Sequence, residues 1–259
     1  MKNIWKIAKK EFRSYFVSPV GYIVLSLFSM LAGWFFFYYL NRFNSLVTYY
    51  QMMRQIDVLR QINLNRLVMA RLFRELHMLF NIFLPAVTMR LIAEEKKQKT
   101  MELLLTSPLR TRDIVMGKYV SVLMFLAVMM ALTLIYPALL FIYGDPSPEI
   151  VPIITGYVGL FLVGSCILSA GLFASSMTEN QIVAFVMGLF ISLLFYVIAY
   201  PSSAIGGSIG GFLQYLSLKE SLEGSLRAFI DTKSIIYYVS FSFVWLFLTH
   251  RVIEGIRVK

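Results

Sequence analysis

Four uncharged stretches of this 259-residue chain each exceed the roughly 20 apolar residues that carry a helix across a bilayer. They cover residues 14–41, 119–144, 150–178 and 180–218. A fifth stretch, 234–250, is slightly short, but Lys233 and Arg251 flank it and can extend their charges to the headgroups. A sixth, 76–89, reaches spanning length when it is extended to Ala93. Stretches of this kind predict membrane-spanning helices.

Composition points the same way. The chain is 58% hydrophobic and only 15% charged, which is more apolar surface than a soluble domain of this size can bury. We therefore predict an all-α, polytopic membrane protein with one transmembrane domain over residues 1–259. Its six transmembrane helices are expected near 19–40, 75–93, 117–143, 152–175, 181–200 and 234–253. The single cysteine, Cys166, lies in an apolar stretch, so no disulfide framework is expected.

The net charge of +10 is explained by a membrane surface, and nucleic acid is not expected as a partner. Lysines and arginines cluster beside the apolar stretches. With six spans and both termini cytoplasmic, 15 of the 24 basic residues face the cytoplasm, as the positive-inside rule favours. The predicted location is therefore the cell (inner) membrane, with membrane lipid as a partner.

The N-terminal 18 residues predict an amphipathic helix lying in the membrane interface. Apolar side chains occupy one half of the helical wheel, and the basic face includes Lys6, Lys9, Lys10 and Arg13. Ser18-Pro19 is expected to end this helix. Glu11 projects from the apolar side. Either it snorkels or pairs locally, or it pairs with a basic residue of the polar insert at 94–118 or of a partner subunit.

Two outer segments leave alternatives open. Residues 42–74 carry six arginines, which fits a second interfacial helix or an arginine-lined vestibule for anions. In residues 201–233, Pro201 is followed by glycines at positions 206, 207, 210 and 211. They fit either a re-entrant segment with short outer helices, which would form a gate or lateral exit, or a flexible loop.

The second predicted span is unusually polar. Polar side chains within a bilayer normally face protein or water, so this helix is expected to line the bundle interior or a pathway. The candidate lining residues are His77, Asn81, Pro85 and Thr88. His77 and the chain's other histidine, His250, are too far apart in the sequence to suggest a metal site, and none is predicted.

A polar insert, 94–118, separates the second and third spans. Thr100 is expected to cap a short helix that has Glu102 near its positive end and stops before Pro108. Thr111 is expected to cap the next helix, with Asp113 in its first turn. Apolar residues at 103–105 amid this charge indicate a docking patch. The alternative is a solvated loop whose leucines fold back on the membrane.

The motif EEKKQKTMELLLTSP at 94–108, followed by Gly117-Lys118, resembles the signature of ABC-2 type transporter permeases. FVSPVGY at 16–22 and SSMTENQ at 175–181 resemble the family's entry into the first span and its short cytoplasmic turn. The C-terminal pattern from YLS at 215–217 to LFLT at 246–249 resembles the branch that includes gliding-motility permeases.

The resemblance implies that residues 94–116 form a cytoplasmic coupling segment that docks on an ATP-binding cassette ATPase. The residues it assigns to this contact are Glu94, Glu95, Lys96, Thr100, Glu102, Leu103, Leu104 and Pro108. It also implies pairing as a homodimer, or as a heterodimer with a related permease. An extracytoplasmic accessory protein is a further candidate partner.

Catalysis is not expected in this chain. It has no G-x-x-x-x-G-K-[ST] phosphate loop, so ATP and Mg would be bound and ATP hydrolysed by the partner subunit. No catalytic residue is assigned, because no His, Asp or Glu cluster lies within the predicted spans. Their centres also lack the acidic residues of a proton-coupled transporter. The predicted function is the membrane pathway for ATP-driven transport, with export favoured and no cargo specified. The alternative is a scaffold that recruits an ATPase without translocating cargo.

Overall fold

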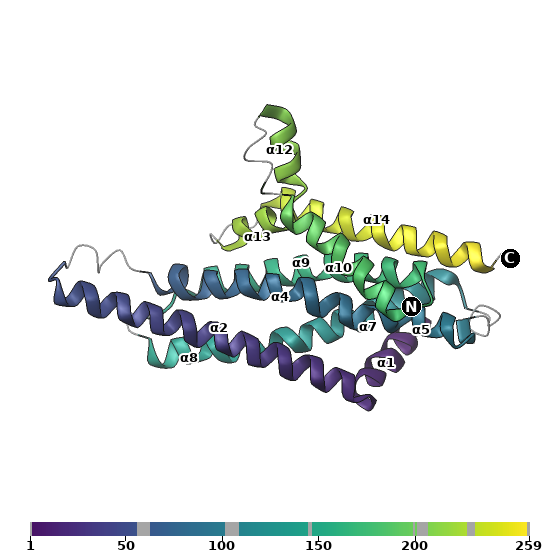
Figure 1. Ribbon diagram of the computed structural model, residues 1–259, viewed down its shortest axis with the longest axis horizontal. Helices are drawn as coiled ribbons and strands as arrows, with labels where there is room; N and C mark the ends of the chain where they lie inside the picture. Colours follow the sequence, from purple (N-terminus) through teal and green to yellow (C-terminus); the bar gives the residue numbers. More distant parts are fainter. Residues whose placement is uncertain are drawn as a thin grey trace.

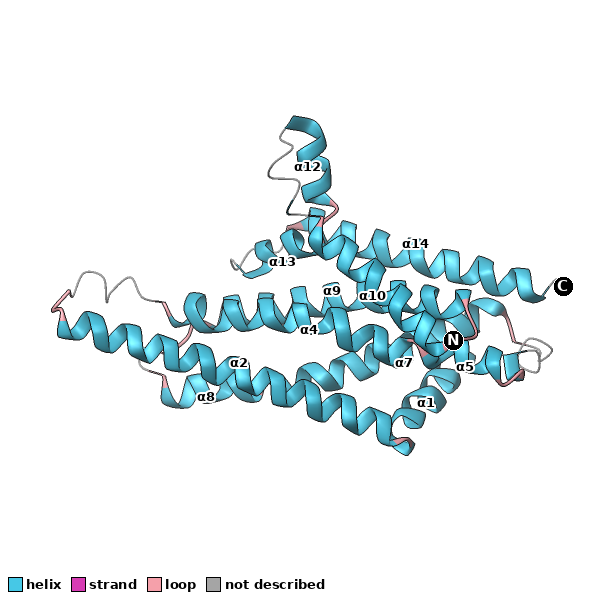
Figure 2. Ribbon diagram, in the orientation of Figure 1, coloured by secondary structure: helices cyan, strands magenta, loops and turns pink. Residues whose placement is uncertain are grey.

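The chain folds into a bundle of long helices. The computed structural model describes residues 2–55, 63–101, 109–144, 147–198, 200, 207–226 and 231–257, and no β-strand occurs among them (Figures 1 and 2). The all-α, polytopic class predicted from the sequence is confirmed. The elements are α1 (Lys2–Val17), α2 (Pro19–Met52), the π-helix η1 (Asn65–Met69), α4 (Ala70–Thr88), α5 (Arg90–Lys97), α7 (Thr111–Thr133), α8 (Ile135–Tyr143), α9 (Ile150–Met177), α10 (Gln181–Val197), α12 (Gly207–Tyr215), α13 (Leu218–Leu226) and α14 (Thr232–Arg257).

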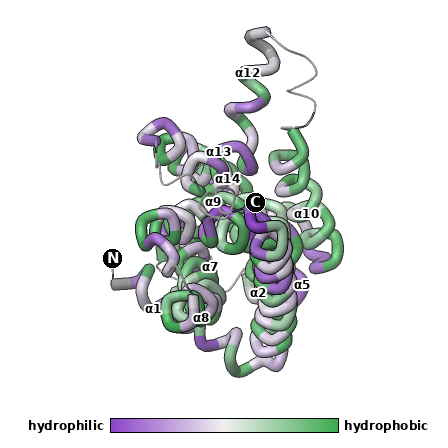
Figure 3. Tube along the Cα trace, turned by 90° about the vertical axis from the view of Figure 1, so that its left-hand side faces the viewer, coloured by the Kyte–Doolittle hydropathy of each residue, from purple (hydrophilic) through white to green (hydrophobic). Residues whose placement is uncertain are grey.

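Five helical units within the described ranges are long and apolar enough to cross a membrane. They run over residues 19–52, 65–97, 111–143, 150–177 and 232–256. The sixth expected span corresponds to α10, which has 17 residues and is about 26 Å long at 1.5 Å per residue. Large apolar side chains such as Trp34, Phe190 and Phe243 are more than 60% exposed, and most residues of α10 are hydrophobic (green in Figure 3). These exposed faces suit a lipid environment.

The α9 helix is largely buried and contacts α4, α7, α10 and α14. Small residues allow its neighbours to approach closely. A Cβ added at Gly171 would collide with the Thr88 side chain of α4, and one at Gly164 would lie 2.7 Å from Leu126 of α7. Close packing through small residues is a common way for helices to associate in membranes. It makes α9 the helix around which the others are placed.

The α1 helix meets α2 at a sharp corner. Ser18 adopts extended backbone angles, and its hydroxyl accepts a hydrogen bond from Val20 N at 3.4 Å. Pro19 occupies the first turn of α2, where its missing N–H costs nothing. The predicted break at Ser18-Pro19 is therefore present. From there α2 runs 34 residues to Met52, 12 beyond the predicted end of the first span at residue 40.

Two of the spanning units are broken near a proline. α4 ends at Thr88, three residues after Pro85, and α5 continues from Arg90 in nearly the same direction. The third unit changes from α7 to α8 at Leu134, three residues before Pro137. Proline removes a backbone donor and crowds the preceding turn, which accounts for the change at Leu134. At Met89 the backbone keeps helical angles and its N–H donates to Pro85 O at 2.9 Å, so α5 continues the course of α4. Together, α4 and α5 link the end of the bundle that carries η1 to the insert.

The two short helices α12 and α13 lie between α10 and α14 in the sequence and on one side of the bundle, beside the end of α14 that is far from the chain termini (Figure 1). α12 projects away from the bundle and α13 packs on α9. Arg74 of α4 makes a bidentate ion pair with Glu223 of α13, with nitrogen–oxygen distances of 2.6 and 2.8 Å. Both chain termini lie at the opposite end, near α5 (Figure 1).

Candidate functional site

A buried ammonium group joins three helices where the polar insert meets the bundle. Nζ of Lys118, on α7, lies 3.2 Å from Glu11 Oε1 on α1 and 2.7 Å from Glu95 Oε1 on α5. It also donates to the backbone oxygen of Leu91 at 2.7 Å. We call Lys118, Glu11, Glu95 and the Leu91 carbonyl the lysine junction.

Local sequence brings these groups together. Gly117 precedes the lysine, and a Cβ there would lie 2.7 Å from the Cβ of Ile7, so only glycine lets α1 pack this closely on α7. Glu11 falls on the same side of α1 as Ile7, one turn later. Glu95 lies one turn after Leu91 on α5, which places its side chain and the Leu91 carbonyl on one face.

The lysine junction uses all three donors of its ammonium group, and that one positive charge faces two carboxylates. The Lys118 side chain is 1% exposed, whereas those of Glu11 and Glu95 are 17% and 19% exposed. An ammonium has three donors, and here the three acceptors come from two carboxylates and one carbonyl. Burying a charge is tolerated when it is paired and fully hydrogen-bonded. The junction therefore holds α1, α5 and α7 in a fixed relation and contains no group arranged for bond-making chemistry.

The same end of the bundle is tied to α9 through a serine. Oγ of Ser175 accepts from the backbone N–H groups of Ile92 and Ala93, each at 3.1 Å, and donates to Met89 O at 2.9 Å. Nζ of Lys96 donates to the backbone oxygen of Ser176. These contacts fix the start of α5 against the end of α9.

A third connection runs from α1 to the break between α4 and α5. The hydroxyl of Tyr15 donates to Val87 O at 3.2 Å, and the Arg90 guanidinium lies 4.6 Å from the centre of the Tyr15 ring. Burial raises the pKa of the Tyr15 phenol, so it keeps its proton and remains a donor. The break between α4 and α5 is thus held by α1 on one side and by α9 on the other.

The residues expected in the coupling segment divide into two groups. Glu94 is part-exposed and accepts from Gln98, and the Thr100 hydroxyl donates to Glu95 O at 3.3 Å. Glu95 and Lys96 point back into the bundle, as described above. Glu102, Leu103, Leu104 and Pro108 lie outside the described residues.

The expected cap at Thr111 is wrong. α7 does begin at Thr111 with Asp113 in its first turn, but the capping position is Arg110, and no side chain caps the helix. Thr111 is 6% exposed and packs into the bundle, which makes it the first helical residue. On α1, Lys6, Lys9, Lys10 and Arg13 are exposed, as their place on the basic face predicts, whereas Glu11 turns inward to the junction.

The expected pathway residues all lie inside the bundle. His77, Asn81, Pro85 and Thr88 are buried on α4, facing α9 and α10. The His77 ring packs edge-on against Tyr196 of α10, and Asn81 donates to His77 O at 2.9 Å. Their role in lining a pathway stays a prediction. Among the described residues no group of three or more His, Cys, Asp or Glu side chains is placed to hold a metal ion.

Sequence reasoning missed the centre of the site. Lys118 and Ser175 entered only as parts of family motifs, with Lys118 also counted as a cytoplasmic charge, and no contact was assigned to either of them or to Tyr15. The signal for Lys118 was available: it is a lysine on the helical face that carries Ile114, Val115 and Val122, all buried. A charge on a buried face requires partners, and Glu11 had already been considered as a partner for a basic residue of the insert.

Comparison with known families supports one identification. The family model described as "ABC-2 family transporter protein" matches residues 5–228, which includes every residue of the lysine junction. The whole of α14 lies beyond the matched range. No curated protein matches the sequence.

Proposed function

The chain belongs to the ABC-2 family of transporter proteins, and we propose that it forms the membrane pathway of an exporter that is driven from outside the bilayer. Members of this family are non-catalytic, multi-pass permease subunits that work with an ATP-binding cassette ATPase. ATP and Mg are bound in that partner. Two permeases, identical or related, pair around the pathway in the cell inner membrane with their termini in the cytoplasm. Export and the pairing are parts of the proposal.

The lysine junction carries this proposal. The insert leaves α5 and returns into α7, so a force on residues 94–116 reaches the membrane through these two helices. Lys118 joins α5 and α7 to each other and to α1 through contacts of 2.7 to 3.2 Å. A displacement of the insert therefore moves α1, α5 and α7 together as one unit. The force is not absorbed by a distortion of α5.

The movement then passes along the second spanning unit. α5 and α4 follow one another across the Pro85 break, and Ser175 anchors that break to α9. Because α4 packs on α9 and α10, rotation of α5 changes how these three helices are packed. Alternating access follows if the two arrangements expose the pathway to opposite sides.

The basic face of α1 completes the cytoplasmic surface. Lys6, Lys9, Lys10 and Arg13 stay exposed while Glu11 holds the helix to the junction. In the proposed complex α1 braces the docking contact, with Glu94 and Glu102 making polar contacts and Leu103 and Leu104 making apolar ones. The docking contact itself rests on the sequence.

The test is co-purification of the tagged permease with its ATPase, followed by measurement of ATP hydrolysis. We expect Leu103→Asp and Glu102→Lys to weaken ATPase binding. Glu11→Gln should leave ATPase binding intact and change the rate of ATP hydrolysis. This substitution weakens the contact of α1 with Lys118, which transmits the movement, and leaves the docking residues unchanged. Glu220→Gln, an exposed carboxylate at the other end of the bundle, is the matched control.

Two outcomes would count against the proposal. Normal binding and hydrolysis with both insert variants would show that the ATPase docks elsewhere. Normal hydrolysis with Glu11→Gln, in a complex that still forms, would favour the scaffold alternative. In that case the chain holds an ATPase but takes no mechanical part in its cycle.

A further inference from the structure

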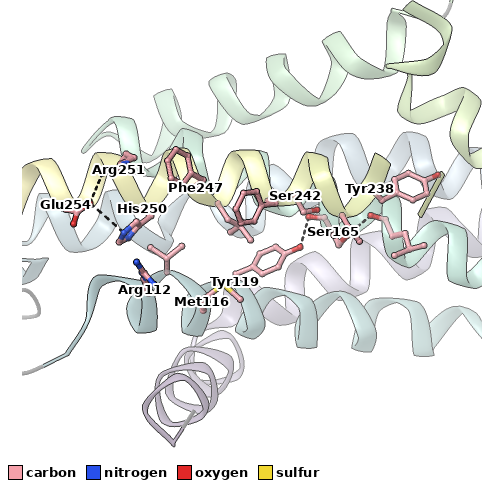
Figure 4. Close-up of a pocket in the computed structure, with 15 residues that line it drawn as sticks. Arg112, Met116, Tyr119, Ser165, Tyr238, Ser242, Phe247, His250, Arg251 and Glu254 are labelled. Carbon is pink, nitrogen blue, oxygen red and sulfur yellow. Dashed lines mark hydrogen bonds and ion pairs between the residues drawn. The ribbon is translucent and has the colours of Figure 1, made fainter. Parts of the chain in front are cut away.

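An elongated groove of about 800 Å³ lies between α7, α9 and α14 (Figure 4). Along α14 its lining extends from Tyr238 to Glu254, which is about 24 Å at 1.5 Å per residue. That length is most of the roughly 30 Å thickness of a bilayer's hydrocarbon core. The groove therefore runs along the membrane-spanning part of the bundle.

The walls of the groove are largely apolar. Val239, Phe243 and Phe247 of α14 are 59%, 68% and 44% exposed, and Met116 of α7 is 39% exposed. On the floor, Tyr119 already donates its hydroxyl to Ser165 O at 3.2 Å. An apolar space does not hold water well, and the medium beside it in a bilayer is hydrocarbon. The chemistry of the walls therefore fits an acyl chain.

The cytoplasmic end of the groove is polar and carries more positive than negative charge. Arg251 and His250 share a single carboxylate, Glu254, at 3.4 and 3.6 Å. Arg112 projects from α7 below His250 (Figure 4) and has no ion-pair partner among the residues described. Two permanent cations thus face one permanent anion.

One ring nitrogen at this end of the groove has no hydrogen-bond partner among the described residues. Nδ1 of His250 is buried and makes no hydrogen bond within the described part of the chain. Its other ring nitrogen faces Glu254. When protonated, Nδ1 is a donor for a phosphate oxygen, and the neighbouring Arg112 guanidinium suits the same group.

We propose that this groove binds an anionic phospholipid. Its phosphate contacts Arg112 and His250, and one acyl chain lies along α14 toward Tyr238. Arg251, whose guanidinium lies 5.1 Å from the Phe247 ring centre, is held at the same level and adds to the positive field. The lipid joins the start of α7, which follows the insert, to the end of α14. This site is separate from the lysine junction, and its Arg112 belongs to the coupling segment 94–116.

The experiment is native mass spectrometry of the permease alone, equilibrated with phosphatidylglycerol or phosphatidylcholine of the same acyl composition. We expect phosphatidylglycerol to be retained preferentially, and Arg112→Gln to reduce that preference about fivefold, as for one surface cation. Lys97→Gln removes an exposed lysine of α5 outside the groove and should leave it unchanged. Leu246→Trp should reduce retention of both lipids by narrowing the groove, whereas Val244→Trp, on the lipid-facing side, should not.

Equal retention of the two lipids would overturn the proposal. So would an Arg112→Gln variant whose lipid preference matched that of Lys97→Gln. If Leu246→Trp abolished self-association and left lipid retention intact, the groove would hold a second copy of the chain, and the proposal would also be wrong. Since no ATPase is present, none of these results depends on the proposed transport function.

Discussion

Replacing Lys118 with methionine removes the charge at the lysine junction while keeping a flexible side chain of similar length. The substitution leaves Glu11 Oε1, Glu95 Oε1 and Leu91 O without their common donor. It also leaves two carboxylates facing one another with no cation between them. Glu95 Oε2 already lacks a partner among the described residues, so that carboxylate has no alternative donor nearby.

The expected loss of stability follows from burial. Removing one partner of a buried ion pair typically costs about 3–5 kcal/mol. The Glu11 and Glu95 side chains are 17% and 19% exposed, so water reaches both, and we expect about 3 kcal/mol, the lower end of that range. Glu11→Gln leaves Lys118 paired with Glu95 and should cost about 1 kcal/mol. The double variant should cost less than the sum of the two, because both remove the same contact.

Equilibrium unfolding in mixed micelles of a denaturing and a mild detergent would measure these free energies. Lys9→Met, which removes an exposed lysine from α1, is the matched control and should change stability by less than about 0.5 kcal/mol. A cost below about 1 kcal/mol for Lys118→Met would refute the reasoning, since it would place that ammonium in water. If the stability lost in the double variant equalled the sum of the losses in the two single variants, Glu11 and Lys118 would not interact.

Three further predictions concern packing, hydrogen bonding and topology. Gly171→Ala should destabilise the bundle by about 1–3 kcal/mol, because its Cβ would collide with Thr88. Gly255→Ala on α14 places its Cβ in open space and should be neutral or slightly stabilising. The same unfolding assay measures both variants. Ser175→Ala should cost about 1–3 kcal/mol because its hydroxyl makes three hydrogen bonds to the α4–α5 break, and smaller losses would show that water replaces it. Leu104→Cys, in a chain without its native cysteine, should react with an impermeant maleimide only after the cells are opened; labelling of intact cells would invert the topology.

The sequence was sufficient for the class of fold and for several local features. The apolar stretches predicted membrane helices because hydrocarbon excludes unpaired backbone groups and so requires regular helices. The amphipathic pattern of residues 2–17 predicted α1, and Ser18-Pro19 predicted its end. These features depend on neighbouring residues, which a sequence shows directly.

The lysine junction was less accessible because its contacts are distant in the chain. Glu11 is 107 residues from Lys118, and only packing of α1 on Gly117 brings the two together. The sequence raised the hypothesis that Glu11 pairs with a basic residue of the insert, but the sequence alone could not identify that residue. In the structure the partner is Lys118. The cap at Thr111 failed for a similar reason, since tertiary packing buried that threonine as the first helical residue.

The length of α2 has a consequence for the membrane surface beside its C-terminal end. Its 34 residues make a rod of about 51 Å, and a tilt of about 54° would be needed to hide that rod in 30 Å of hydrocarbon, beyond the usual range of about 0–40°. The last turns of α2 therefore extend beyond the lipid into water. Their polar residues include Asn41, Asn44, Ser45 and Thr48. A soluble protein that approaches the membrane from that side contacts the projecting end of α2 before it reaches the headgroups.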